Sequence, residues 1–425
     1  MKEGKTAIIR GKVLTPNGET QKVLIFKDGI ILGLADEAPS DADEVIDASG
    51  CYVSPGFIDI HTHGAGGADF MDGTVEAYLT AARMHAIHGT TLLYPTTLTC
   101  SDEVLFRSFD VYRDAREANT EGAQFGGIHL EGPYFSPAQA GAQDPRYLRN
   151  PRPEEYLAIL DRCPDIARWS FSPELEGASA FAAELHRRGV LASIGHTNAT
   201  FDECDAAYKA GARHMTHFFS CMSTIVRRNS YRTAGALEYG YYQEGISLEI
   251  IGDGIHVPST LLRMIIRVRG VDSIALITDS MRAAGMPDGI YKLGDLETGQ
   301  DVIVEDGVAK LMDRRAFAGS VATTDRLVRT LIRDGGCTLL ESVQMASANP
   351  ARFMGIQDHK GSLEKGKTRT LSSSTRALIS REQSLKVKQS TNADKEFQGR
   401  QAICESLRQQ GVDGRGGRQR SGHPS

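Results

Sequence analysis

The chain has 425 residues, of which 40% are hydrophobic and 24% charged, and its formal net charge is −6. This is the composition of an ordinary globular protein, and the acidic balance disfavours a nucleic-acid-binding protein, whose surface is normally basic. No stretch approaches the roughly 18 consecutive apolar residues of a membrane span, so we expect no membrane insertion. The N-terminus lacks an apolar signal core, and the seven cysteines are scattered without a CxxC pair, which indicates reduced thiols in the cytoplasm.

Residues 1–54 are predicted to form a small β unit. Asn-Gly and Asp-Gly dipeptides, which supply the positive φ angles of tight hairpins, separate short apolar runs. The unit is too short to form a large core alone. Its strands are expected at 6–10, 22–26 and 29–33, with turns at 16–18 and 27–29.

Residues 55–354 alternate short apolar runs with segments of helical period. Strands that are apolar on both faces and alternate with helices form a parallel sheet covered by helices, and eight such units predict a (β/α)8 barrel. The predicted fold class is therefore α/β, a TIM-like barrel with a small β-sandwich-like domain. The strands are expected at 56–61, 90–95, 127–131, 169–172, 190–195, 214–217, 247–252 and 273–278, and helices at 75–88, 103–118, 178–188, 201–210 and 259–269.

Polar side chains finish most of these runs on the C-terminal side. In such a barrel all C-terminal strand ends open onto one face, where active sites are built. So many metal-capable groups at strand ends are hard to explain by packing alone. They are His61, His63, Thr96, Glu131, His196, His217, His256 and Asp279.

Five of these residues form a candidate metal-ligand set. His61 and His63 lie two apart on a strand, so both rings project from one face and can reach one ion. Glu131 ends an apolar strand, where an unpaired carboxylate is costly to bury. With His196 and His217 it makes a set suited to Zn²⁺ or Fe²⁺. All five would be enough for two ions.

Asp279 is predicted to be either a sixth ligand or the group that transfers protons. A carboxylate beside a metal-activated water can take its proton and hand it to a leaving amine. An N-cap role for the following segment is the structural alternative. His129, two residues before Glu131, is interpreted as a satisfied core histidine.

Arg227, Arg228 and His256 are candidates for binding an anionic substrate group. Arginine binds phosphate oxygens bidentately, although a charge pair in a loop is usually just solvated. No Walker loop or dinucleotide-binding fingerprint is present.

These motifs together resemble the amidohydrolase superfamily and, within it, the family of N-acetylglucosamine-6-phosphate deacetylases. The resemblance runs from about residue 5 to Lys367. It is carried by residues 55–64, 129–133, 195–199, 216–218, 253–257, 278–280 and 319–320. The His-Leu-Glu-Gly-Pro string together with the later Gly-His-Thr is quite specific.

The resemblance implies hydrolysis of the acetamide of N-acetylglucosamine 6-phosphate to glucosamine 6-phosphate and acetate, in amino-sugar catabolism, by a cytoplasmic homodimer. Glu131, His196 and His217 would hold the main metal, Zn or Fe. His61 and His63 would bind a second ion, which some members lack.

The resemblance also implies roles for the remaining site residues. Asp279 would be the base and then the acid, and Arg228 and His256 would bind the sugar phosphate, with a contribution across the dimer interface. Gln143 stands where better-known members have a histidine that helps to polarise the scissile carbonyl. Ser220 and Cys221 stand where many members have Asn-Ala, which bears on sugar recognition.

Residues 355–425 are expected to return towards the small β unit up to about 367 and then to form an aberrant tail. Residues 368–425 hold 11 Lys+Arg, 5 Asp+Glu and one aromatic residue, which predicts disorder. The family continues here with a strand such as Asp-Ala-Asp-Leu-Ile-Val-Phe-Asp. One set of codons able to encode residues 368–375, read with one G restored in front, encodes that strand. We therefore hypothesise a one-base frameshift near Lys367, which would leave strand edges unpaired and lower the stability.

Three alternatives stay open. The amino sugar could be N-acetylgalactosamine 6-phosphate, because Gln143 and Ser220 depart from the family pattern. The chain could be an inactive metal-binding relative because of its altered C-terminus. An amidohydrolase acting on a cyclic amide is less favoured, since no strand end carries a lysine suited to carbamylation.

Overall fold

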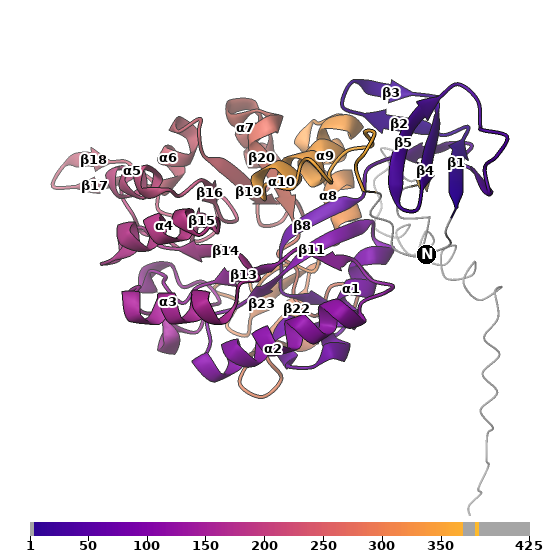
Figure 1. Ribbon diagram of the computed structural model, residues 1–425. Helices are drawn as coiled ribbons and strands as arrows, with labels where there is room; N and C mark the ends of the chain where they lie inside the picture. Colours follow the sequence, from indigo (N-terminus) through magenta and orange to yellow (C-terminus); the bar gives the residue numbers. More distant parts are fainter. Residues whose placement is uncertain (1–3, 369–378, 382–425) are drawn as a thin grey trace, which may run out of the picture. The chain divides into compact units, whose positions relative to one another are not determined.

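The computed structural model describes residues 4–368 and 379–381. The small β unit contains two four-stranded sheets of order β5-β4-β1-β6 and β24-β7-β2-β3. Figure 1 shows its strands β1 to β5 lying together. Asp28 and Gly29 both have positive φ, 48° and 82°, at the predicted hairpin turn. The strands are β1 Lys5–Ile9, β2 Lys12–Thr15, β3 Gly18–Thr20, β4 Val23–Lys27, β5 Ile30–Ala35, β6 Glu44–Asp47, β7 Cys51–Val53 and β24 Ile379–Arg381.

The core of the small unit draws on both ends of the described chain. Ile8, Val13, Leu24 and Phe26 pack with Leu363, and each is at most 6% exposed. The backbone after Leu363 then runs beside β5, where Ile31 N donates to the Lys367 carbonyl at 3.0 Å. The described residues 363–367 thus contact the small unit, and the predicted limit of this return near residue 367 stays a prediction. The predicted disordered tail falls almost wholly outside the described residues; within it the three-residue β24 pairs with β7.

Eight parallel strands form the barrel, and each overlaps one of the predicted apolar runs. Neighbouring strands pair in parallel around the ring. The ring closes where Asp279 N donates to the His61 carbonyl at 2.9 Å and Thr62 bridges Ser280 in parallel. In ring order the strands are β8 Phe57–Thr62, β11 Thr90–Thr97, β13 Ile128–Glu131, β14 Ile166–Phe171, β15 Leu191–Ile194, β16 His214–Met215, β19 Ser247–Ile251 and β20 Ile274–Ile277.

Helices surround the barrel strands (Figure 1). The sequence marks several helix starts: the Ser101 hydroxyl accepts from Val104 N, and Thr200 and Glu203 form a capping box. The five predicted helices correspond to α1 Val75–Ile87, α2 Asp102–Ala118, α4 Ala178–Arg187, α5 Phe201–Ala210 and α7 Ser259–Arg269. Further helices are α3 Pro153–Arg162, α6 Ala236–Tyr242, α8 Thr324–Thr330, α9 Leu339–Ala346 and α10 Ala348–Phe353.

Several short elements were not predicted. An antiparallel sheet, with β21 Gly289–Leu293, β22 Gln300–Glu305 and β23 Val308–Leu311, follows the last barrel strand. The other elements are β9 Gly64–Ala65, β10 Ala68–Asp69, β12 Gln124–Phe125, β17 Val226–Arg228, β18 Tyr231–Thr233, η1 Phe70–Asp72, η2 Pro137–Gln139, η3 Pro145–Tyr147, η4 Val271–Ser273 and η5 Leu331–Gly335. Among the described residues, no helix has both the length and the apolar character needed to cross a membrane.

Candidate active site

The carboxyl ends of the barrel strands bring the candidate metal ligands together. In a closed parallel sheet these ends share one face, so residues far apart in sequence meet there. Each of the six side chains is almost completely buried. They are His61 in β8, His63 just after it, Glu131 at the end of β13, His196 after β15, His217 after β16 and Asp279 after β20.

One ligand group consists of Glu131, His196 and His217, whose ligand atoms all lie within 4.8 Å of one another. Glu131 Oε1 is 3.2 Å from His196 Nε2 and 3.0 Å from His217 Nε2. The two Nε2 atoms are 3.0 Å apart. One carboxylate and two imidazoles supply the three protein ligands typical of a catalytic Zn²⁺ site.

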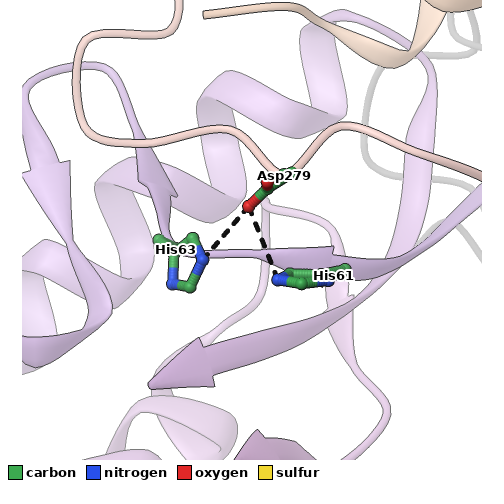
Figure 2. Close-up of side chains that lie close together, drawn as sticks. All are labelled: His61, His63 and Asp279. Atoms are coloured by element: carbon green, nitrogen blue, oxygen red, sulfur yellow. Dashed lines mark ion pairs between the residues drawn. The ribbon is translucent and has the colours of Figure 1, made fainter. Parts of the chain in front are cut away.

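The second ligand group consists of His61, His63 and Asp279 (Figure 2). Asp279 Oδ1 is 3.4 Å from His61 Nε2 and 3.2 Å from His63 Nε2. Glu131 joins the two groups, because its Oε1 lies 3.5 Å from His61 Nε2 and its Oε2 lies 3.4 Å from His63 Nε2. All five ligands predicted from the sequence therefore share one centre, and Asp279 lies with them.

The partners of the other ring nitrogens indicate which nitrogen faces a metal. The contacts are His61 Nδ1 to Glu249 Oε1 at 2.7 Å, His63 Nδ1 to the Thr96 carbonyl at 3.2 Å and His196 Nδ1 to the Gln139 carbonyl at 2.9 Å. A carboxylate or carbonyl only accepts, so in each neutral ring Nδ1 carries the hydrogen and Nε2 keeps a lone pair. Within the described residues the buried His61 Nε2 has no hydrogen-bond partner. Lone pairs converging on carboxylate oxygens fit a divalent cation.

Charge is concentrated in this cluster. Burial disfavours the charged form of His61, but the carboxylates of Glu249, Asp279 and Glu131 outweigh burial and raise its pKa to about 9. The pKa of His63 is raised to about 10, since Asp279 and Glu131 again outweigh burial. Burial would raise the pKa of Asp279, yet the two imidazoles hold it below its usual range. Asp279 is therefore an ionised carboxylate at neutral pH.

Three site residues have left-handed backbone conformations although none is glycine. The φ angles are 46° at His196, 29° at His217 and 48° at Asp279. Such conformations are uncommon outside glycine and concentrate at functional sites, where the surrounding fold holds them. At each of these positions the chain has just left a barrel strand.

A cavity of about 300 Å³ opens in front of the ligands. That volume lies at the lower end of the range for small-molecule sites. Ser220, Cys221 and Gln143 line it. The Gln143 side chain donates from Nε2 to Glu131 Oε2 at 2.7 Å and accepts from Thr99 N at 2.8 Å.

His256 also lines the cavity. Its Nδ1 is 2.8 Å from Asp253 Oδ2, and its ring contacts Phe317, with the ring centroids 4.6 Å apart. Arg228 lies in β17. Its side chain falls outside the described part of the chain, so its candidate role stays a prediction.

His129 is the satisfied core histidine that the sequence indicated. Its Nε2 is 2.7 Å from Ser170 Oγ and its Nδ1 is 3.2 Å from Thr96 Oγ1. Sequence reasoning missed Asp253 and Glu249, which hold His256 and His61. The available signal for Glu249 was a carboxylate in the middle of the apolar strand β19.

The chain is similar in sequence to proteins of known activity. The chain is 33% identical over 358 residues to the N-acetylglucosamine-6-phosphate deacetylase of Lysinibacillus sphaericus, covering 83% of this chain and 89% of that protein. It is 32% identical over 371 residues to the Bacillus subtilis (strain 168) enzyme of that name, covering 86% and 87%.

The chain is also similar in structure to a protein of this name. A mutant N-acetyl-D-glucosamine-6-phosphate deacetylase from Mycobacterium smegmatis, in complex with N-acetyl-D-glucosamine-6-phosphate, superposes with a TM-score of 0.77 at 32% identity. The match covers 87% of this chain and 94% of that one. The sequence profile of the amidohydrolase family matches residues 52–371. This chain therefore belongs to the amidohydrolase family.

Proposed function

We propose that this chain is a metal-dependent deacetylase that hydrolyses N-acetylglucosamine 6-phosphate to glucosamine 6-phosphate and acetate. The observation that carries the proposal is the meeting of four imidazoles and two carboxylates at the mouth of the barrel, facing a cavity of about 300 Å³. Relatives of that name cover most of the chain, and this supports the choice of substrate. We also propose that the protein is cytoplasmic and forms a homodimer.

Glu131, His196 and His217 are proposed to hold the main Zn or Fe ion, with His61 and His63 as ligands of a second ion. A divalent ion there would lower the pKa of a coordinated water from about 15.7 towards about 7 and polarise the acyl oxygen. Gln143 is proposed to hold Glu131 in place and to turn its second Nε2 hydrogen towards the acyl oxygen of the substrate.

Asp279 is proposed to move the protons. Its carboxylate lines the cavity and is ionised at neutral pH, so it can accept a proton from the attacking water. The water oxygen adds to the acyl carbon, and the carbon–nitrogen bond then breaks. Asp279 returns the proton to the departing amine, which leaves acetate and the free amino sugar.

His256 and Arg228 are proposed to bind the phosphate. Asp253 accepts from His256 Nδ1, which orients the ring and leaves Nε2 available for a contact with an anionic oxygen. Ser220 and Cys221 line the cavity beside the ligand His217 and are proposed to contact the sugar.

Acetate release from N-acetylglucosamine 6-phosphate by the purified, metal-loaded chain tests the proposal. We expect turnover that chelation abolishes and zinc or iron restores. A folded protein that binds metal but releases no acetate would instead support the inactive metal-binding alternative.

N-acetylgalactosamine 6-phosphate is the second candidate substrate. One relative, 33% identical over 320 residues, is the N-acetylgalactosamine-6-phosphate deacetylase of Escherichia coli O157:H7. Comparing kcat/KM for the two epimers decides between them, and we expect the larger value for the glucosamine derivative.

A further inference from the structure

The inside of the barrel contains a buried ion pair directly beneath the candidate metal ligands. Arg168 in β14 and Glu249 in β19 are both 0% exposed and bonded to each other. Barrel interiors are usually filled by branched apolar side chains. A buried pair of this kind gives little net stability, because desolvation offsets the attraction. Stability alone therefore explains it poorly.

One oxygen of Glu249 contacts both ligand groups. Glu249 Oε1 is 2.7 Å from His61 Nδ1, on the side of the ring opposite the ligand atom. The same oxygen accepts from the backbone N–H of His217 at 2.9 Å. His61 belongs to one ligand group and His217 to the other.

The contact with His61 sets the ring's tautomer and orientation. A carboxylate only accepts, so Nδ1 of the neutral ring donates and Nε2 presents its lone pair. The contact with His217 holds the backbone of a residue whose φ of 29° is unfavourable for residues other than glycine. Both contacts thus act on ligand geometry.

The second oxygen of Glu249 anchors the carboxylate. Glu249 Oε2 accepts from Arg168 Nη1 and lies 3.4 Å from His214 Nε2. Arg168 is itself held across the barrel, since its Nη1 donates to the Ile60 carbonyl at 3.1 Å and its Nη2 donates to Thr216 Oγ1 at 3.0 Å. Arg168 therefore holds Glu249 in place inside the barrel.

We infer that Glu249, anchored by Arg168, is a positioning residue that aligns His61 and His217 so that the two ligand groups accept divalent metal together. This inference rests on the metal-binding part of the proposed function. Partners of metal-ligating histidines typically change metal affinity about 10- to 100-fold when mutated.

The test uses Glu249→Gln in the full chain. Gln keeps the shape, but it can offer an N–H to His61 Nδ1 and so reverse the tautomer. With Zn²⁺ alone in competition with a chromophoric chelator, we expect affinity to fall about 10- to 100-fold. The visible spectrum of the Co²⁺-substituted protein should change as well. Unchanged affinity together with an unchanged spectrum would overturn the inference.

Asp72→Asn is the matched control. It removes a nearly buried carboxylate from an arginine ion pair, Asp72 with Arg282, that contacts no candidate ligand. This variant should keep wild-type Zn²⁺ affinity, and an equal loss in both variants would reduce Glu249 to a structural role. If Glu249→Gln does not fold, Arg168→Lys loosens the same anchor. It should weaken Zn²⁺ binding to a smaller degree, and unchanged binding there counts against the inference.

Metal affinity needs no substrate, so the two proposals can fail separately. Weakened Zn²⁺ binding in Glu249→Gln, with no acetate release by the wild type, would retain the inference and reject the deacetylase. Acetate release by the wild type, with unaltered Zn²⁺ binding in the variant, would retain the deacetylase and reject the inference.

Discussion

Replacement of Asp279 by asparagine separates proton transfer from metal binding. The asparagine side chain would keep the volume and an oxygen near His61 and His63, which now lie 3.4 and 3.2 Å from Asp279 Oδ1, but it cannot accept a proton. General acid–base catalysis contributes about 100- to 10,000-fold. At about 1.36 kcal/mol per factor of ten, that is roughly 3–5 kcal/mol of transition-state stabilisation. We expect kcat to fall by that factor.

The assay is acetate release at saturating N-acetylglucosamine 6-phosphate, with metal content measured on the same samples. Metal content should stay at the wild-type level, because His61, His63 and Glu131 still face the same centre. Asp295→Asn, a buried carboxylate bonded to Thr298, is the control and should keep full turnover. Loss of metal together with turnover would reassign Asp279 as a ligand, and retained turnover would refute its role in proton transfer.

Three further predictions follow from the geometry. The carboxylates that outweigh burial raise the pKa of His61 to about 9 and of His63 to about 10, so protons compete with the cation. The Zn²⁺ affinity should therefore decrease as the pH is lowered from about 8 to about 6. An affinity that increases over this range would contradict the prediction. His256→Ala should raise KM about tenfold for the phosphorylated sugar, but an equal rise for unphosphorylated N-acetylglucosamine would exclude a phosphate contact. Restoring the reading frame near Lys367 should raise the melting temperature, and equal values would argue against the frameshift account.

The barrel could be predicted because its signals are local. Each strand is a short apolar run, and each of the five predicted helices has the 3.6-residue period. The alternation of these segments along the chain was therefore enough to predict eight strands and the polar residues at their ends. The small sheet β21–β23 was missed because its strands are partly exposed, so they lack the continuous apolar runs by which the barrel strands were predicted. The predicted domain limits at 54 and 354 stay predictions.

The meeting of the candidate ligands could be predicted from the sequence, but the residues that support them could not. His61, Glu131 and His217 carry chemistry in their own residue types, and parallel strand ends must meet at one face. The pairing of Glu249 with Arg168 joins strands 81 positions apart in sequence, and only the closed barrel places one beside the other. A single charged residue in an apolar strand indicates burial with a partner, but it does not say which partner.

The central claim is that Glu131, His196 and His217 hold a divalent metal ion, and that His61 and His63 are ligands of a second ion. Anomalous diffraction from crystals of the zinc-loaded protein tests it most directly. We predict a peak within bonding distance of Glu131, His196 and His217, with a second peak beside His61 and His63 when two ions bind. Density for zinc elsewhere, with none among these residues, would contradict the account.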